Sequence, residues 1–198
     1  MPVTATRSTD ARRNILDAAR RIMAHKGYSA VGLNEVLAQA GVPKGSFYHY
    51  FASKDAFGEA LLQNYFEQYL ADMDRTLAQP GLSAAERLMA YWQAWRETQS
   101  VDDCQGQCLV VKLAAEVSDL SEPMRLALKE GTDAIIDRLE RTIASGLTDG
   151  TVEIDGSPRE TAQTLYDMWL GASVMAKIHR NIACLDVAMA MTRRLVQP

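Results

Sequence analysis

Long apolar runs are missing from this 198-residue chain, although 47% of its residues are hydrophobic. No stretch of about 18 apolar residues occurs, and the first residues, MPVTATRSTDARRN, contain no apolar segment of the kind a secretion signal needs. The apolar content is still enough to form a real core, which argues against disorder. We therefore expect a globular protein in the cytoplasm, with no membrane association.

Cysteine and histidine are scarce, with three of each. An odd number of cysteines in a chain without an export signal argues against a disulfide framework. His25, His49 and His179 fall on separate predicted helices and have no paired acid. This pattern does not predict an enzyme active site, and no Cys/His spacing predicts a metal site. We expect no cofactor.

Charge is distributed unevenly along the chain. Residues 1–54 carry eight Lys/Arg and three Asp/Glu, a net of +5, whereas the remainder carries a net of −9. A basic head on an acidic body is typical of a protein in which only the head meets a polyanion. Solvated helix faces are the alternative interpretation of the same charges.

Hydrophobic spacing predicts an all-α fold of about nine helices without a convincing sheet. The helices are expected to begin near residues 9, 33, 43, 53, 83, 105–108, 122, 157 and 185. Gly27 and Gly41 fit left-handed C-terminal caps, and Ser83–Glu86 and Ser157–Glu160 have the pattern of capping boxes. Residues 108–117 also fit a buried strand, but a lone strand among helices has no partner.

The helix expected to begin near residue 157 carries Leu165, Trp169, Ala172 and Met175. In the last helix, side-chain spacing predicts that Ala188, Met191 and Leu195 face inward. Cys184 is expected in the core. Residues 146–156 are the one clear loop.

The segment GVPKGSFYHYF, residues 41–51, is a helix stop, a turn and a new short helix. Two short helices joined by a Gly-containing turn form a helix-turn-helix, whose second helix enters a DNA major groove. Phe47 and Phe51 can turn inward. The residues expected outward or at the rim of this helix are Lys44, Gly45, Ser46, Tyr48, His49 and Tyr50. An ordinary helical hairpin with exposed aromatics is the alternative.

Residues 10–56 resemble the N-terminal DNA-binding domain of the TetR family of repressors. The resemblance is carried by Gly27, Leu33, Val36, Ala40-Gly41-Val42, Lys44-Gly45, Phe47-Tyr48, Tyr50-Phe51 and Lys54. It implies a homodimer that binds a palindromic, double-stranded DNA operator. Residues 1–53 would form the helix-turn-helix domain, and residues 54–198 the regulatory and dimerisation domain.

The resemblance also implies roles for individual residues. Asn34 would lie near a phosphate at the start of the second helix. Bases would be contacted by Lys44, Gly45, Ser46 and His49, and the DNA backbone by Tyr48, Tyr50 and Lys54. His49 occupies a position that varies in the family, so its base preference stays open.

The segments 106–125 and 166–180 look like the subgroup of N-ethylmaleimide reductase repressors, which respond to electrophiles and oxidants through a cysteine at the position of Cys108. A helix beginning near Cys108 would favour its thiolate, and Lys177 is the cation that the resemblance places in the pocket. Alternatively, Cys108 is a small buried apolar residue. Cys104 is either a second, resolving thiol or a bystander.

An aromatic group offers a different trigger. Tyr91, Trp92, Trp95, Tyr166 and Trp169 could line an apolar cavity for a noncovalent inducer, although at helical spacing they equally fit a plain core. A third class is a DNA-binding scaffold that senses nothing. The sequence thus predicts a TetR-like DNA-binding dimer and leaves its trigger open between a reactive thiol and a bound small molecule.

Overall fold

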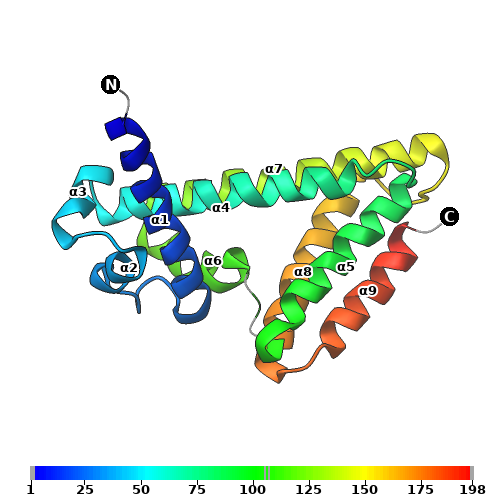
Figure 1. Cartoon of the computed structure of the whole chain (residues 1–198). Helices are drawn as coiled ribbons and strands as arrows, with labels where there is room; N and C mark the ends of the chain where they lie inside the picture. The colour runs from blue at the N-terminus through cyan, green and yellow to red at the C-terminus, as the bar shows by residue number, and fades with distance from the viewer. Residues whose placement is uncertain (1–2, 105, 107, 197–198) are drawn as a thin grey trace. The chain divides into compact units, whose positions relative to one another are not determined.

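The structure, a computed structural model, describes residues 3–104, 106 and 108–196. Within these residues it consists of nine α-helices and one 3-10 turn, without strands, and this confirms the predicted all-α fold (Figure 1). The elements are α1 (Val3–Lys26), α2 (Leu33–Ala40), η1 (Lys44–Ser46), α3 (Phe47–Tyr50), α4 (Lys54–Leu77), α5 (Ala84–Cys104), α6 (Leu109–Leu120), α7 (Glu122–Asp149), α8 (Pro158–His179) and α9 (Ala183–Val196).

Local capping signals determine several of these boundaries, as predicted. Gly27 and Gly41 adopt left-handed conformations, with φ of 89° and 67°, directly after α1 and α2. The N–H of Glu160 donates to Ser157 Oγ and the Glu160 carboxylate accepts from the Ser157 N–H, which completes the capping box at the start of α8. Ser83 and Glu86 form the same reciprocal pair at the start of α5.

Three predicted boundaries differ from the structure. Helix α1 begins at Val3 rather than near residue 9, because no Gly or Pro interrupts residues 3–9. Helix α9 begins at Ala183. Helix α7 continues to Asp149, so the loop starts later than Gly146. A Cβ on Gly146 would collide with Val152, and the amides of Thr151 and Val152 donate to the Gly146 carbonyl. This glycine therefore permits close packing of the loop on α7 and does not end the helix.

The chain divides into two compact units that do not follow chain order. Unit 1 contains Met1–Glu67 and Gln107–Lys129, and unit 2 contains Gln68–Gly106 and Glu130–Pro198. In unit 1, α1, α2 and α3 gather near the start of α4 (Figure 1), and α1 also packs on α6. The core of unit 1 includes Ile15, Leu16, Phe57 and Leu61.

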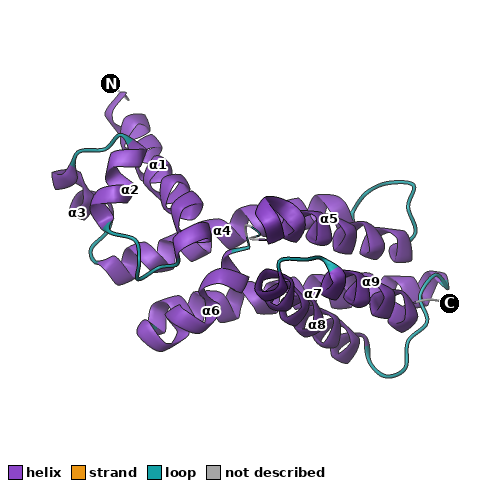
Figure 2. Cartoon of the chain, turned by 90° about the horizontal axis from the view of Figure 1, so that it is seen from below, coloured by secondary structure: helices purple, strands orange, loops and turns teal. Residues whose placement is uncertain are grey.

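Unit 2 is organised around α5, α8 and α9, which pack on one another and lie side by side (Figures 1 and 2). Its largest fully buried side chains are Trp92, Tyr166 and Trp169. Among the residues that the structure describes, no helix is long and apolar enough to cross a membrane.

One inward-facing prediction for α9 is wrong: Ala188 is buried, but Met191 is 36% exposed. On α8, Leu165 and Trp169 are buried and Met175 is 41% exposed. Cys184 is only half-buried and is not part of the core. The apolar face of α8 and α9 thus extends beyond the part that the rest of this chain buries.

Candidate DNA-binding and sensor sites

The segment from Lys44 to Tyr50 is a short rigid projection of unit 1. It starts as a 3-10 turn and continues as one turn of α-helix. Phe47 and Phe51 are buried, and both rings contact the buried ring of Phe57 on α4, with centroids 5.4 and 5.1 Å away. These aromatic contacts fix the back of the segment, so its opposite face has a defined orientation.

The eight predicted DNA-contacting residues all lie in unit 1. Asn34, Lys44, Gly45, Tyr48, His49 and Lys54 are exposed, whereas Ser46 and Tyr50 are half-buried. Tyr48 is 72% exposed, the largest value among the exposed large hydrophobic side chains. An added Cβ on Gly45 would meet no described atom within 4 Å, so this backbone can be approached from outside.

Two residues outside the predicted site support Lys54. The Tyr28 hydroxyl donates to the Lys54 carbonyl at 2.9 Å, and the Lys54 ammonium lies 4.8 Å from the centre of the Tyr28 ring. The amides of Tyr28 and Ser29 donate to the two carboxylate oxygens of Glu116, at 3.0 and 2.6 Å. Sequence reasoning missed both Tyr28 and Glu116, because their contact joins positions 88 residues apart.

Electrostatics at this contact is consistent with a charged carboxylate. Burial alone would raise the pKa of Glu116, but hydrogen bonds from Ser29 and Tyr28, and the nearby Lys112, outweigh it and lower that pKa. Burial, followed by the charges of Asp55 and Glu116, raises the pKa of Tyr28 to about 12. Tyr28 therefore stays a hydrogen-bond donor at neutral pH.

Cys108 is the residue that immediately precedes α6, at its N-cap position. Its side chain is buried, and the hydroxyl of Tyr65 on α4 donates to its sulfur at 3.5 Å. The carbonyl of Cys108 accepts the N–H of Lys112, which closes the first turn of the helix. The predicted helix start at this cysteine is confirmed, and the positive end of the helix dipole favours a negative charge there. Tyr65 had not been predicted as a neighbour.

The other sensor candidates belong to unit 2. Lys177 is half-buried and lies in the last turn of α8. Cys104 is the buried last residue of α5 and has a φ of 59°, a conformation that L-residues other than Asn and Asp seldom adopt. The structure thus places Cys108 in one compact unit, and Cys104 and Lys177 in the other.

The five predicted pocket aromatics pack against one another. The rings of Trp92 and Trp169 are stacked, with centroids 5.0 Å apart and an interplanar angle of 9°. Trp95 contacts Trp92 and Tyr166 at 5.7 and 5.9 Å. The indole N–H of Trp95 donates to Ser173, and that of Trp169 donates to Thr192. This arrangement is that of a packed core stabilised by its polar edges.

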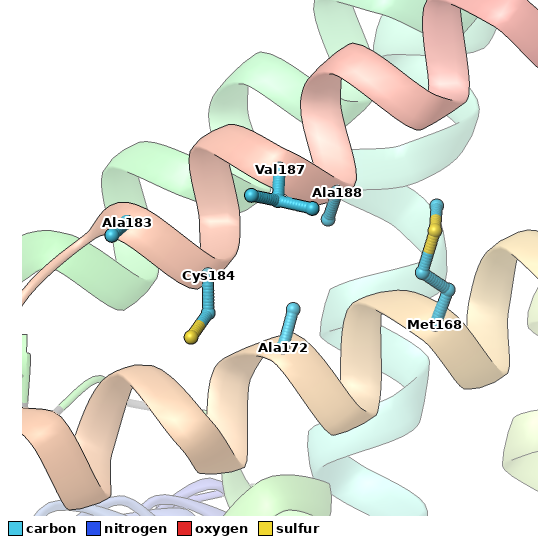
Figure 3. A pocket seen from close by; sticks show the side chains of 6 residues that line it. All are labelled: Met168, Ala172, Ala183, Cys184, Val187 and Ala188. Atoms are coloured by element: carbon cyan, nitrogen blue, oxygen red, sulfur yellow. The ribbon is translucent and has the colours of Figure 1, made fainter.

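A pocket between α8 and α9 is lined entirely by small or apolar side chains (Figure 3). In this view Ala172 and Met168 on α8 face Cys184, Val187 and Ala188 on α9. Exposed apolar residues on the same two helices are Val174, Met175, Ile178, Val187 and Met191. Five exposed apolar side chains on two adjacent helices are more than the scattered single residues that are ordinary on a protein surface.

Helix α2 is followed by the left-handed Gly41 and then by the short helical segment of η1 and α3, which exposes polar side chains. Two short helices joined in this way define a helix-turn-helix protein. The family of bacterial regulatory proteins, tetR family, matches residues 15–61, and the tetracyclin repressor-like C-terminal domain matches residues 84–192. The chain therefore belongs to the TetR family of DNA-binding transcriptional regulators.

Individual relatives agree with this assignment over almost the whole chain. The HTH-type transcriptional repressor NemR of Escherichia coli K12 is 36% identical over 187 residues, which are 94% of each chain. The repressor DhaR of Mycobacterium sp. strain GP1 is 31% identical, over 96% of this chain and 94% of its own. A crystal structure of the reduced form of E. coli NemR superposes with a TM-score of 0.91, at 37% identity, covering 96% of this chain and 98% of that one.

Proposed function

We propose that the protein is a homodimeric repressor that binds a palindromic operator through residues 1–53 and senses a small molecule through residues 54–198. The observation that supports this most strongly is the segment from Lys44 to Tyr50. Its aromatic back is buried, while lysine, histidine and tyrosine side chains remain exposed on its outer face. Because its buried aromatic side already fixes the segment, its exposed side chains can form hydrogen bonds in a DNA groove with little further loss of conformational entropy.

Within this proposal the exposed residues divide into two groups. Lys44, Gly45, Ser46 and His49 contact base edges, and Asn34, Tyr48, Tyr50 and Lys54 contact the phosphate backbone. The net charge of +5 on residues 1–54 attracts the duplex, and the net charge of −9 on the remainder keeps it away from the rest of the chain. Binding is therefore expected to weaken steeply with salt.

The dimer would form through α8 and α9. Met191 was expected to face inward, and its exposure, like that of Met175, is explained if a second copy of the chain covers both side chains. Ile178 and Val187, each more than 60% exposed, belong to the same surface. Val187→Glu should then shift the protein towards monomer in analytical ultracentrifugation. The matched control is Leu147→Glu, which charges a side chain on α7 that is also exposed and apolar.

Cys108 is the proposed sensor. Its sulfur accepts a hydrogen bond from Tyr65 and lies at the N-terminus of α6, and both features stabilise a thiolate. The crystal structure of E. coli NemR mentioned above is of its reduced form. An electrophile would alkylate the thiolate and add bulk to a buried position between α4 and α6, and the helices would have to move.

An oxidant offers a second route through Lys177. Two-electron oxidation of the thiolate by hypochlorite, followed by hydrolysis, gives a sulfenic acid and chloride. Attack of the Lys177 amine on that sulfur would release water and form an S–N bond. Cys104 would compete by forming a disulfide with the same sulfenic acid. Both products are two hydrogens lighter than the reduced protein, so intact mass alone does not separate them, but the variants do: a loss of two hydrogens that persists in Cys104→Ser and disappears in Lys177→Arg assigns the bond to Lys177, and the reverse pattern assigns it to Cys104.

A noncovalent inducer is the second candidate. The stacking of Trp92 on Trp169 and the hydrogen bonds of the Trp95 and Trp169 indoles favour a core role for the aromatic cluster, although the buried indole N–H of Trp92 has no hydrogen-bond partner among the described residues. The apolar pocket between α8 and α9 could hold a small apolar molecule instead, although the same pocket lies on the proposed dimer surface. A scaffold without a sensor would respond to neither type of molecule.

One titration separates these possibilities. A labelled duplex is selected for binding to the wild-type protein from a random-sequence pool, and its affinity is measured with increasing N-ethylmaleimide or hypochlorite. Wild type and Cys104→Ser should lose affinity, whereas Cys108→Ser should not. Equal loss in all three proteins would contradict the sensor assignment, and no loss in any would favour the scaffold.

A further inference from the structure

Helix α6 packs on α1, and it also makes a polar contact with the chain after that helix through the side chain of Glu116. Its two carboxylate oxygens each accept one backbone amide, from Tyr28 at 3.0 Å and Ser29 at 2.6 Å. Both amides belong to the segment directly after α1. Consecutive N–H groups directed at one anion form a compact anion-binding arrangement, and each bond to a charged acceptor is stronger than a neutral one.

Gly27 makes this approach possible. It ends α1 with a φ of 89°, and its amide still donates to Met23 at 2.9 Å. A Cβ at this position would lie 3.1 Å from the Glu116 carboxylate, closer than ordinary van der Waals contact. The glycine therefore provides both the left-handed turn and the space for the acid.

The contact continues from Tyr28 to the start of α4. Tyr28 is 4% exposed, and its hydroxyl donates to the Lys54 carbonyl at 2.9 Å. The Lys54 ammonium lies over the Tyr28 ring at 4.8 Å. Gly58 leaves room for this hydroxyl, because a Cβ there would lie 3.0 Å from it. Each link from Glu116 to Lys54 is thus a direct contact within unit 1.

We propose that Glu116 is a positioning residue for operator binding, which holds Tyr28 so that Tyr28 presents Lys54 to the DNA backbone. The inference rests on the phosphate contact assigned to Lys54 under the proposed function. Movement of α6 would then change the placement of Lys54, although no residue of α6 is assigned a contact with DNA.

The sign of one mutation separates positioning from simple charge. Glu116→Gln removes a negative charge from the DNA-binding unit, so Coulomb attraction alone would strengthen binding to the polyanion. A positioning role predicts weaker binding, because the side-chain amide of the Glu116→Gln variant has one acceptor oxygen, whereas the carboxylate has one for each of the Tyr28 and Ser29 N–H groups. We expect Glu116→Gln to weaken binding of the selected duplex about fivefold or more. Asp119→Asn, which removes a charge from the exposed side of the same helix, should leave the affinity unchanged or slightly higher.

A double-mutant cycle tests whether Glu116 acts through Lys54. Lys54→Ala keeps the carbonyl that accepts from Tyr28 but removes the ammonium. In the Lys54→Ala background, Glu116→Gln should change affinity by less than about twofold. Tyr28→Phe should weaken binding in the wild-type background and add little to Glu116→Gln. Thermal unfolding of each variant verifies that the proteins are folded, and Tyr28→Phe serves as the test if Glu116→Gln does not fold.

The outcomes are distinct. If Lys54→Ala binds as tightly as wild type, the proposed phosphate contact of Lys54 is wrong. If Lys54→Ala weakens binding but Glu116→Gln matches Asp119→Asn, only the positioning role is wrong. A loss from Glu116→Gln that persists fully in the Lys54→Ala background would also overturn it, as would wild-type affinity in Tyr28→Phe.

Discussion

Two helix contacts, one in each compact unit, differ in kind. In unit 1, the contact between α6 and the segment after α1 is polar, with the carboxylate of Glu116 bound to two amides. In unit 2, α5 and α8 meet through stacked tryptophans, and hydrogen bonds occur at the edges of the aromatic cluster. Apolar burial is non-directional and large, whereas a charged hydrogen bond is directional and sensitive to charge.

The difference suggests a division of labour. A core of stacked rings resists small displacements, because many atom contacts are lost together. The contact at Glu116 depends on few atoms, so a shift of α6 can break it without unfolding the unit. A transcriptional switch needs both properties, a stable body and a joint that can be released. The following substitutions test whether the two units differ in this way.

The largest expected effect is on the stability of unit 2. Trp169→Ala removes a fully buried ring, its stacking on Trp92 and its hydrogen bond to Thr192. We expect a loss of about 3–5 kcal/mol in the free energy of unfolding. Tyr48→Ala, which truncates a 72% exposed ring of unit 1, should cost less than about 0.5 kcal/mol. Urea denaturation at one fixed protein concentration measures both, and similar losses would contradict the comparison.

DNA affinity, unlike stability, should be changed most by substitutions of exposed residues in unit 1. Lys54→Ala removes an exposed ammonium and should weaken binding to all sequences by about tenfold, with the salt slope reduced by about one. Lys44→Ala should instead reduce the preference for the selected duplex over a scrambled one. Fluorescence anisotropy at several salt concentrations measures both quantities. An unchanged salt slope in Lys54→Ala would contradict its phosphate contact.

Local signals made the helix ends predictable, but not the contacts between distant segments. Gly27, Gly41 and Ser157 act on backbone groups within a few residues, so their roles can be inferred from sequence. The approach of Glu116 to Tyr28 depends on packing between segments 88 residues apart. Nothing in the local pattern distinguishes this acid from Asp119 on the same helix.

The exposed methionines show another limit of sequence reasoning. Helical spacing identifies Met175 and Met191 as apolar positions on the last two helices. It does not tell whether these positions are covered by the same chain or by another copy, and both residues are exposed in the single chain. Similarly, the predicted helix start at Cys108 followed from its surroundings in sequence, whereas its neighbour Tyr65 required the packing of α4 against it.

A smaller effect concerns the reactivity of Cys108. Tyr65→Phe keeps the ring but removes the hydroxyl that donates to the sulfur. Because that donor favours the thiolate, its loss should raise the pH midpoint of alkylation by N-ethylmaleimide by about 0.5–1 pH unit. Stopped-flow alkylation of Cys104→Ser/Cys184→Ser protein isolates the Cys108 rate. Tyr69→Phe, whose hydroxyl pairs with Tyr91, is the matched control. Equal pH midpoints in Tyr65→Phe and wild type would contradict the role of the Tyr65 hydroxyl in stabilising the Cys108 thiolate.

The smallest expected effect is a pH dependence that belongs to unit 1. The pKa of Glu116 is lower in the folded state than the value of about 4.3 for an unfolded chain, so its stabilising contribution is complete above that value. It is lost as the pH falls through the folded-state pKa. Between about pH 5 and 3, wild type should therefore lose roughly a few tenths of a kcal/mol more stability than Glu116→Gln, because the carboxylate is partly accessible to solvent. The difference between wild type and Trp169→Ala should stay constant over the same range, since stacked rings do not titrate. If the stability difference between wild type and Trp169→Ala changed with pH as much as that between wild type and Glu116→Gln, titration of Glu116 would not explain the pH dependence of unit 1.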